Sequence, residues 1–575
     1  MENAAIRMQG LSFTYAGADA PVLRDIDLNI GRGKFTVIMG RTGVGKTTLA
    51  LVSNGIIPQL VEGTLEGSVV SGGYDLSKFR VQTAAKEVGL VLQDPETQIF
   101  GRTVEEDVAF GPRNYLVPRE EIFRRIKQAL AKVRLDGYEK RQTSQLSGGE
   151  KQRLAIAGIL AMSPSILILD EPTSELDPIG REEIYSTMCS LQKTQGITVV
   201  AIEHSSQEIS EKADEIVVLG DGRIVWQGDP KEFFRDLPLV DRWGIKPLPV
   251  SCVGWSLFEK GYIGKEEIPL GVDEAHALVR RLLGGRRLRL PAPEPAPARG
   301  APLIEVRDVS FRYDNGKTAL ENVSLDICEG DYIALIGQNG AGKTTLAKHF
   351  NSIHKPCAGT VTVCGRDTAK EEPNTLAQLI GYVFQNPDNQ IFSTSVYKEM
   401  EYGLKNAGIG AEEADRRIRE TAELLHLTDV LDEHPFSLGK GERQRIAVAS
   451  ILVLRPKILV VDEPTTGQDW DGIRHMMQLI DELHAAGTTI VMITHDMDVV
   501  ASHASRVVVM AQGHIVADGP TREVFAQTKA LEAAYVSRPQ IVELSDRLGE
   551  QGLGRLALTA DELAGAILTS LEAEQ

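Results

Sequence analysis

The chain has 575 residues, which is too long for one ordinary domain and is typical of three or four. Hydrophobic residues make up 42% of the sequence, enough for sizeable cores, which argues against wholesale disorder. The net charge of -18 argues against a general nucleic-acid binder, because such proteins are usually basic.

The sequence contains no segment that we expect to enter a membrane. Its N-terminal end lacks a basic and then apolar leader, so no secretory signal is evident, and no apolar run approaches the roughly 20 residues that span a bilayer. We therefore expect any role at a membrane to depend on partner proteins. The five cysteines are scattered and form no CxxC pair, which favours reduced thiols in a reducing compartment.

The chain carries the same series of motifs twice. The matched segments are 12–15 with 310–313, 40–47 with 337–344, 93–95 with 385–387 and 170–173 with 462–465. Matched residues stay between 291 and 298 positions apart, which indicates one order of elements with only short insertions.

The repeat and a change in composition predict five parts. We expect the two repeats at 1–228 and 303–519, small helical appendages at 229–290 and 520–575, and a Pro/Ala-rich linker at 291–302. The appendages are too small to stand alone, so we expect them to pack on the repeats or on each other. Five arginines precede the linker, either as a solvated helix end or in contact with acidic lipid headgroups. They are Arg280, Arg281, Arg286, Arg287 and Arg289.

Within each repeat the pattern predicts an α/β fold. Short apolar runs that end at a glycine-rich turn predict strands at 35–39 and 332–336. Wholly apolar runs at 165–169, 197–202, 457–461 and 489–493 are typical of strands inside a parallel sheet. The amphipathic stretches 120–134 and 412–425 predict helices.

Both glycine-rich loops fit the pattern G-x-x-x-x-G-K-[ST] between a strand and a helix, which predicts ATP binding. Glycines let backbone N–H groups converge on phosphate oxygens at a helix N-terminus. Lys46 and Lys343 would neutralise the β- and γ-phosphates, and Thr47 and Thr344 would bind Mg²⁺. The nucleotide-binding residues expected here are Gly40, Gly43, Gly45, Lys46, Thr47, Thr48, Gly337, Gly340, Gly342, Lys343, Thr344 and Thr345.

An Asp-Glu pair ends an apolar strand in each repeat, where carboxylates are costly unless they meet a cation or water. We assign Asp170 and Asp462 to the Mg²⁺ shell. Glu171 and Glu463 would act as general bases toward the attacking water. The alternative is that these acids only cap helices.

A histidine and a tyrosine also recur. His204 and His495 each follow a strand, and although a lone histidine is more often structural, the repeated placement favours contact with the γ-phosphate. Tyr15 and Tyr313 precede their loops by 25 and 24 residues. Their rings can stack on adenine, whereas a single tyrosine would fit a core or surface position equally well.

The segments 93–95 and 385–387, which begin with Gln93 and Gln385, are called the glutamine segments. The segment 146–150, Leu-Ser-Gly-Gly-Glu, lies between the first glutamine segment and the strand that ends at the Asp-Glu pair. With this segment, both repeats resemble ATP-binding cassette (ABC) ATPases. The resemblance implies a mixed sheet with a helical signature subdomain. It also implies an intramolecular cassette dimer stacked head to tail, in which each ATP lies between the loop of one cassette and the signature of the other. Gln93 and Gln385 would then sense Mg²⁺ and the membrane partner. The signature residues are Ser147, Gly148, Gly149, Gly439, Lys440 and Gly441.

The second signature departs from the family pattern. Gly439 replaces the serine, Lys440 replaces a glycine, and Gln468 replaces the usual apolar residue of the following loop. Because these changes fall on the ATP held by the first loop, we expect unequal sites, with Glu463 carrying most of the turnover.

The segments 93–100 and 385–392 resemble the energising ATPases of energy-coupling factor (ECF) importers, which take up vitamins and transition-metal ions in prokaryotes. The resemblance implies transmembrane transporter subunits and a membrane substrate-binding subunit as partners, with no nucleic acid. The chain would lie peripherally at the cytoplasmic face of the cell membrane. The Ile-Phe pairs at 99–100 and 391–392 either receive a coupling helix or belong to the core. The alternatives are the tandem ATPase of a sugar or peptide importer, and a soluble cassette protein acting on ribosomes or DNA.

Overall fold

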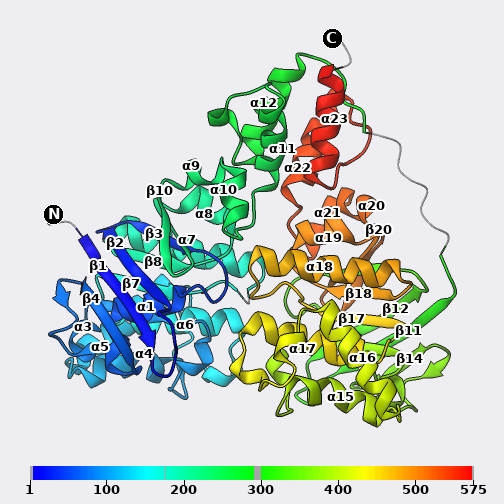
Figure 1. Cartoon of the computed structure of the whole chain (residues 1–575), viewed down its shortest axis with the longest axis horizontal. Coiled ribbons are helices and arrows are strands. Elements are labelled where there is room, and N and C mark those ends of the chain that lie inside the picture. Colours follow the sequence, from blue (N-terminus) through cyan, green and yellow to red (C-terminus); the bar gives the residue numbers. More distant parts are fainter. Residues whose placement is uncertain (1–3, 175, 291–298, 573–575) are drawn as a thin grey trace. The chain divides into compact units, whose positions relative to one another are not determined.

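A computed structural model describes residues 4–174, 176–290 and 299–572, and the chain falls into two compact units, 1–251 and 252–575. Each unit holds one repeat, built from two sheets and surrounding helices (Figure 1). Residues 291–298 of the predicted linker and Glu175 lie outside the described residues.

In the described part of the first unit, the strands form two sheets. The antiparallel sheet has the order β2-β1-β4-β5, with β2 at Leu23–Gly31, β1 at Ala4–Tyr15, β4 at Gly63–Ser71 and β5 at Tyr74–Asp75. The mixed sheet has the order β10-β9-β3-β8-β7-β6, with β10 at Arg223–Gly228, β9 at Glu215–Gly220, β3 at Phe35–Met39, β8 at Thr198–Ile202, β7 at Ile166–Asp170 and β6 at Val88–Val91. Its strands are parallel except β10, so the carboxyl ends of β3, β7 and β8 share one edge.

The helices of the first unit cover the mixed sheet and build a helical layer from α4, α5 and α6 (Figure 1). Their bounds are α1 Lys46–Asn54, α2 Ile56–Gln59, α3 Val81–Ala84, α4 Val104–Asn114, α5 Arg119–Lys132, α6 Gly148–Leu160, α7 Pro178–Gln195, α8 Ser206–Lys212, α9 Pro230–Phe234 and α10 Leu237–Arg242. The helix α11, Pro249–Glu259, crosses the boundary between the units. The first appendage begins on its own cassette, where Phe233 of α9 packs on Trp226 of β10.

The described part of the second unit repeats both sheets. The antiparallel sheet runs β12 Thr318–Cys328, β11 Pro302–Arg312, β14 Ala358–Val363 and β15 Arg366–Asp367. The mixed sheet runs β16 Ile380–Val383, β17 Ile458–Asp462, β18 Thr489–Ile493, β13 Tyr332–Ile336, β19 Arg506–Ala511 and β20 His514–Pro520. The helices are α12 Val272–Leu283, α13 Lys343–Phe350, α14 Pro373–Leu376, α15 Val396–Asn406, α16 Ala411–Leu424, α17 Lys440–Leu452, α18 Trp470–Ala485, α19 Met497–His503, α20 Thr521–Ala526, α21 Thr528–Ala533, α22 Gln540–Arg547 and α23 Ala560–Glu572.

The predicted strands agree with the structure to within one residue. The expected strands 35–39, 332–336 and 489–493 coincide with β3, β13 and β18, whereas β7 and β17 each begin and end one residue later than expected. All five residues of β7 and of β17 are buried, which confirms the prediction of strands inside a parallel sheet. The fold is therefore the predicted α/β class, with mixed sheets.

The two appendages pack on each other within the second unit. Helix α12, from the first appendage, lies against α22 and α23 of the second (Figure 1). The Leu288 backbone N–H donates to the Gln551 carbonyl at 2.9 Å, and Arg547 forms an ion pair with Asp273. The helices of the two appendages thus form one cluster, which polar contacts also hold together.

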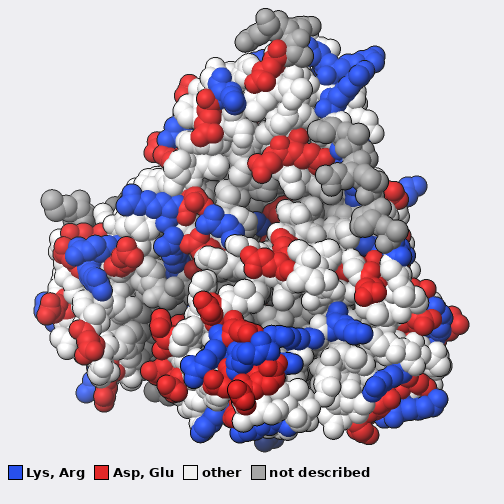
Figure 2. Space-filling model, turned by 45° about the vertical axis from the view of Figure 1, so that its right-hand side comes forward, with Lys and Arg blue, Asp and Glu red and all other residues white. Residues whose placement is uncertain are grey.

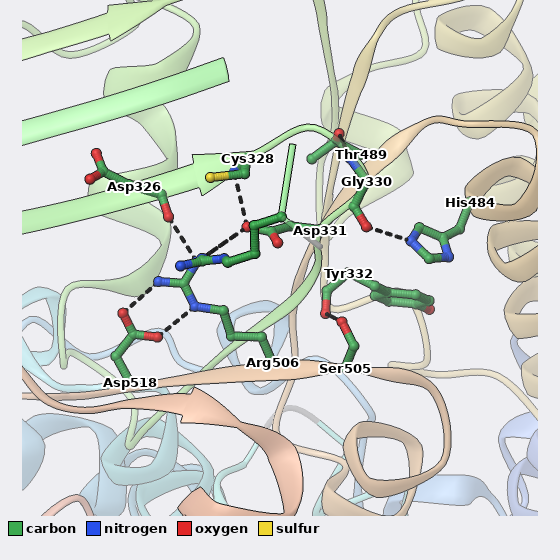
Figure 3. Close-up of polar contacts among 11 residues, drawn as sticks. Asp326, Cys328, Gly330, Asp331, Tyr332, His484, Thr489, Ser505, Arg506 and Asp518 are labelled. Atoms are coloured by element: carbon green, nitrogen blue, oxygen red, sulfur yellow. Dashed lines mark hydrogen bonds and ion pairs between the residues drawn. The ribbon is translucent and has the colours of Figure 1, made fainter. Parts of the chain in front are cut away.

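An ion pair at the beginning of the central strand has opposite signs in the two cassettes; it is largely buried in the second, whereas Lys34 in the first is about half exposed. In the second unit Asp331, just before β13, lies 3.2 Å from Arg506 at the start of β19, and Arg506 also binds Asp518 (Figure 3). In the first unit the corresponding positions hold Lys34 and Glu215, 3.7 Å apart. This end of the sheet is opposite the glycine-rich loops, so the pair is structural.

The surface is rich in charge of both signs. On the face shown in Figure 2, acidic and basic side chains are interspersed over most of the surface. No helix among the described residues is long and apolar enough to cross a membrane. The five cysteines are free thiols.

Candidate functional site

The glycine-rich loops join β3 to α1 and β13 to α13, as their motif predicts. Gly40 and Gly337 have φ angles of 141° and 144°, which L side chains rarely adopt. A Cβ on Gly40 would lie 2.2 Å from the Leu219 carbonyl oxygen, and one on Gly337 would lie 2.1 Å from that of Met510. Only glycine lets these loops turn so close to the neighbouring strand and begin a helix directly beyond it.

The loop lysines are folded across the loops that carry them. Lys46 Nζ donates to the carbonyl oxygens of Gly40 at 2.9 Å and Arg41 at 2.8 Å. Lys343 Nζ makes the same two bonds in its loop, at 2.7 and 3.1 Å. Both lysines are buried. Each ammonium group is therefore held at a helix N-terminus, the place in a protein best suited to a phosphate group.

Asp170 and Asp462 lie at the carboxyl ends of β7 and β17, beside the loop threonines. Burial raises the pKa of Asp170 to about 6, and the Thr47 hydroxyl hydrogen-bonds its carboxylate. Asp170 Oδ1 is buried without a hydrogen-bond partner among the described residues. Thr344 Oγ1 donates to Asp462 Oδ1 at 3.4 Å. An orphaned buried carboxylate oxygen beside a hydroxyl is a hard oxygen set that fits Mg²⁺.

The residue directly after each strand, Glu171 or Glu463, has a φ angle of 46° or 52°, in the left-handed region. Such conformations cost free energy and cluster at functional sites. Gln93 Nε2 donates to Glu171 Oε2 at 2.7 Å, and His204 Nε2 lies 3.2 Å from Glu171 Oε1. In the second unit, His495 Nδ1 lies 2.8 Å from Glu463 Oε2. The predicted base and histidine thus meet in both cassettes.

Both glutamines are exposed, and in the first cassette Gln93 hydrogen-bonds Glu171. A tyrosine that sequence analysis missed occupies the second site. Tyr382 donates its hydroxyl to Asp462 Oδ2 at 2.8 Å, and Leu90 is its counterpart in the first cassette. Tyr382 lies within a short buried strand, so its sequence pattern gave no functional signal.

The two tyrosines proposed for adenine are fixed to the loop helices. Tyr15 hydrogen-bonds Thr48 at 2.9 Å, and Tyr313 hydrogen-bonds Thr345 at 2.8 Å, in both cases between hydroxyl oxygens. Both rings are partly accessible. The bonds place an aromatic ring next to the first turn of each phosphate-binding helix.

The two signatures begin equivalent helices but differ in side-chain chemistry. Ser147 caps α6 by accepting from the Glu150 backbone N–H, at 3.3 Å, while Gly148 and Gly149 form its first turn. Gly439 has no hydroxyl to offer α17, and only the Glu442 carboxylate accepts from the Gly439 N–H, at 2.9 Å.

In the second signature, Lys440 replaces a glycine and Gln468 replaces an apolar residue. Their side chains fill the space beside the beginning of α17. A Cβ on Gly467 would lie 2.9 Å from Lys440 Nζ, so the lysine folds back onto its own following loop. A Cβ on Gly441 would lie 3.3 Å from Gln468 Oε1; in the first cassette, Leu176 packs at the matching place beside Gly149.

A model of the ABC transporter family matches residues 23–174 and 320–466, which include both loops and both Asp-Glu strands. A protein of Caldanaerobacter subterraneus that is named as an ABC transporter ATP-binding protein is 41% identical over 557 residues, covering 96% of this chain and 97% of the relative. The chain belongs to the ABC transporter family. A similarly named protein of Methanosarcina mazei is 39% identical over 561 residues, covering 96% of this chain and 95% of its own length.

Two solved structures each match less than half of this ABC protein. CbiO1 from Clostridium perfringens, part of the ABC transporter complex CbiONQ, is 33% identical; the match covers 40% of this chain and 94% of that one, with a TM-score of 0.37. The ATP-binding cassette MJ0796, in a dimeric post-hydrolysis state with ADP and phosphate, is 28% identical; the match covers 38% of this chain and 99% of that one, with a TM-score of 0.36.

Membership of the ABC family identifies the chain as an ATPase with two cassettes that use ATP and Mg²⁺ to power transport.

Beside each ABC glutamine segment lies an exposed aromatic pair. Phe100 is 69% exposed and stacks on Phe110 at 5.4 Å, while Phe392 is 62% exposed and meets Tyr402 edge-on at 4.8 Å. The preceding isoleucines differ, because Ile391 is buried and Ile99 is half-buried. The phenylalanines are therefore surface residues, and Ile391 is a core residue.

Proposed function

We propose that this ABC ATPase energises an ECF-type importer for a vitamin or a transition-metal ion, through separate membrane subunits. The observation that carries the proposal is the glutamine segment, which has the ECF-like sequence in both repeats and is followed in both by an exposed aromatic pair. The helical appendages, which ECF ATPases also carry, support it. The chain then lies peripherally at the cytoplasmic face of the membrane.

In this proposal each cassette binds ATP through its own loop. Lys46 and Lys343 exchange their carbonyl partners for β- and γ-phosphate oxygens, and Tyr15 and Tyr313 stack on adenine. Thr47 with Asp170, and Thr344 with Asp462, would hold Mg²⁺, which offsets phosphate charge when bound. Gln93 and Gln385 would also bind Mg²⁺ and would report to the membrane partner.

Hydrolysis then rests on the glutamates and histidines. Glu171 or Glu463 takes a proton from the water that attacks the γ-phosphorus, so that the γ-phosphate leaves ADP as inorganic phosphate. His204 and His495 hold these carboxylates, at 3.2 and 2.8 Å, and donate to the γ-phosphate.

The signatures complete the sites from the opposite cassette, in a head-to-tail pair within one chain. Ser147, Gly148 and Gly149 face the ATP of the second loop. Gly439, Lys440 and Gly441 face the ATP of the first.

The exposed aromatic pairs form docking positions for a helix of the transmembrane subunit, with Phe100 and Phe392 as apolar anchors. Burying an exposed phenylalanine stabilises a contact by about 1.5–3 kcal/mol. A charge at either position should therefore weaken the complex strongly.

Purification of the chain from membranes in mild detergent tests the proposal. The wild type should bring down a transmembrane subunit and a small substrate-binding membrane protein, identified by mass spectrometry. Phe100→Asp and Phe392→Asp should lose these partners while still binding ATP. Leu60→Asp, at another exposed apolar position of the first cassette, should keep them. Dependence on a periplasmic binding protein instead would show a different importer class.

A further inference from the structure

The first cassette has a buried carboxyl group beside its catalytic centre, and the second cassette lacks it. Glu203 follows β8, immediately precedes His204 and is 3% exposed. The equivalent residue in the second cassette is Thr494, whose hydroxyl accepts from the Asp496 N–H at 3.0 Å. None of the roles assigned above uses Glu203.

The contacts of Glu203 join the two segments that carry the catalytic side chains. Thr173 Oγ1 donates to Glu203 Oε1 at 2.8 Å, and the His204 backbone N–H also hydrogen-bonds the Glu203 carboxyl group. Thr173 comes two residues after Glu171, whose Oε1 lies 3.2 Å from His204 Nε2. The segment 171–173 and the segment 203–204 are therefore bonded twice, once at the catalytic face and once beneath it.

A third buried residue belongs to this polar cluster. Tyr185 of α7 is fully buried near Thr173 and Glu203, and its hydroxyl has no hydrogen-bond partner among the described residues. Its equivalent in the second cassette is Met477. The two repeats thus differ at both positions, with Glu203 and Tyr185 in the first and Thr494 and Met477 in the second.

The burial of Glu203 also sets its charge. Burial raises the pKa of Glu203 to about 8, and nearby carboxylates add to this, so the group is mostly protonated at neutral pH. It then adds no negative charge to the site. The titratable and charged groups that face this cluster are Glu171 after β7, His204 after β8, Glu208 and Lys212 on α8, and Arg181 and Tyr185 on α7.

We propose that Glu203 is a positioning residue of the first cassette, whose buried, hydrogen-bonded carboxyl group holds His204 and the loop after β7 together and thereby orients Glu171 for hydrolysis. The proposal rests on the roles of Glu171 and His204 given above. When Glu203 ionises, it keeps the bonds donated by Thr173 and His204 but places a further negative charge beside Glu171. Turnover at the first site therefore falls at alkaline pH, and turnover at the second site, which has Thr494, does not share this decline.

The test measures hydrolysis at the first site alone. In the full chain with its membrane partners, Glu463→Gln silences the second site, and single-turnover hydrolysis of Mg-ATP is followed on both sides of pH 8. In Glu203→Gln the side chain keeps the shape of the protonated carboxyl group and stays neutral at every pH. The rate of hydrolysis at neutral pH should therefore be kept, and its decline at alkaline pH should be lost. Glu203→Thr with Tyr185→Met should slow hydrolysis by about tenfold or more with ATP affinity unchanged, because the carboxylate of Glu171 is less well oriented.

Thermal unfolding separates positioning from folding. Glu203 should destabilise the cassette increasingly as pH rises from 4.5 toward about 8, because the folded state must keep it protonated. Glu203→Gln should therefore raise the Tm in that window. Thr198→Val is the matched control, since Thr198 lies at the other end of β8 and accepts from the Gly33 N–H at 3.0 Å. It should lower the Tm and leave the pH profile of hydrolysis unchanged.

Three outcomes would overturn the proposal. The first is an alkaline decline that persists in Glu203→Gln. The second is normal turnover in the folded Glu203→Thr, Tyr185→Met protein; if that protein does not fold, Glu203→Gln decides alone. The third is unchanged first-site hydrolysis in Glu171→Gln, which would remove the role of Glu171 and this proposal with it. Loss of hydrolysis in Glu171→Gln with no effect at Glu203 would overturn only the positioning role.

Discussion

At the scale of single residues, the lysines of the two loops have the simplest chemistry to test. Each lies folded on loop carbonyls, and a charge-assisted bond to phosphate is worth about 1.5–3 kcal/mol. We expect Lys46→Ala and Lys343→Ala each to abolish tight binding at one site. Equilibrium dialysis should give close to two ATP per chain in the wild type and close to one in each variant. Unchanged stoichiometry in both would disprove the assignment.

The signature residues predict that the two sites turn over at different rates. Ser147 offers a hydroxyl that Gly439 lacks, and Lys440 lies folded on its own loop near Gly467. Losing one hydrogen bond to a charged group costs about 1.5–3 kcal/mol. If the bond is made in the transition state, the rate at the first loop falls roughly ten- to a hundredfold.

An ATPase assay with the membrane partners present compares the two glutamates. Glu463→Gln should remove the larger share of activity, because in the proposed head-to-tail pair the ATP of the second loop would face the Ser147 signature. Equal losses, or a larger loss from Glu171→Gln, would contradict the asymmetry.

The site residues that were predicted from the sequence are those that belong to short local motifs. Gln93, Glu171 and His204 come together because each follows one of three adjacent parallel strands, and the carboxyl ends of such strands share an edge. Tyr382 and Glu203 were not predicted. Each contacts a partner distant in sequence, Asp462 or Thr173, and neither Tyr382 within its apolar strand nor Glu203 directly after one belongs to a recognisable motif.

At the scale of secondary-structure elements, the strands were predictable to within one residue because burial on both faces leaves long apolar runs. The packing of α12 on α22 and α23 was one of two expected arrangements, and amphipathic pattern alone does not select a partner. The exchange of charges between Lys34–Glu215 and Asp331–Arg506 was also not predicted, since each pair joins strands far apart in sequence.

The ion pair between Asp331 and Arg506, whose charges are reversed in the first cassette, gives a prediction for the second cassette. Asp331→Lys places a third cation beside Arg506 and Arg299, which both now bind Asp331 at 3.2 Å. Removing one partner of a buried pair costs about 3–5 kcal/mol, so the free energy of unfolding measured in urea should fall by an amount of that order.

A matched rescue separates charge from packing. Adding Arg506→Glu and Asp518→Gln reproduces the lysine, glutamate and glutamine of the first cassette, where Gln227 bonds Glu215. This triple variant should recover most of the stability. No recovery would mean that side-chain packing, and not charge pairing, decides this position.

At the scale of the whole molecule, the fusion of two cassettes predicts an ATP-dependent pair within one chain. In a chain without native cysteines, Ser147→Cys and Asn339→Cys should cross-link when ATP is bound, and the product should stay monomeric in size. Mixing chains that carry one cysteine each is the control and should give no cross-link. Cross-links that form only between chains would show a different arrangement.

In the whole chain, the Asp-Glu pairs of both cassettes are proposed to hydrolyse ATP and so to drive a membrane partner. The most direct measurement is ATP hydrolysis and ATP binding by the chain co-purified with its membrane subunits, in the wild type and in the Glu171→Gln, Glu463→Gln double variant. Removing general bases costs about 10²–10⁴-fold in rate. The double variant should still bind close to two ATP per chain and should hydrolyse them at least about a hundredfold more slowly. Hydrolysis at the wild-type rate in that variant would contradict the account.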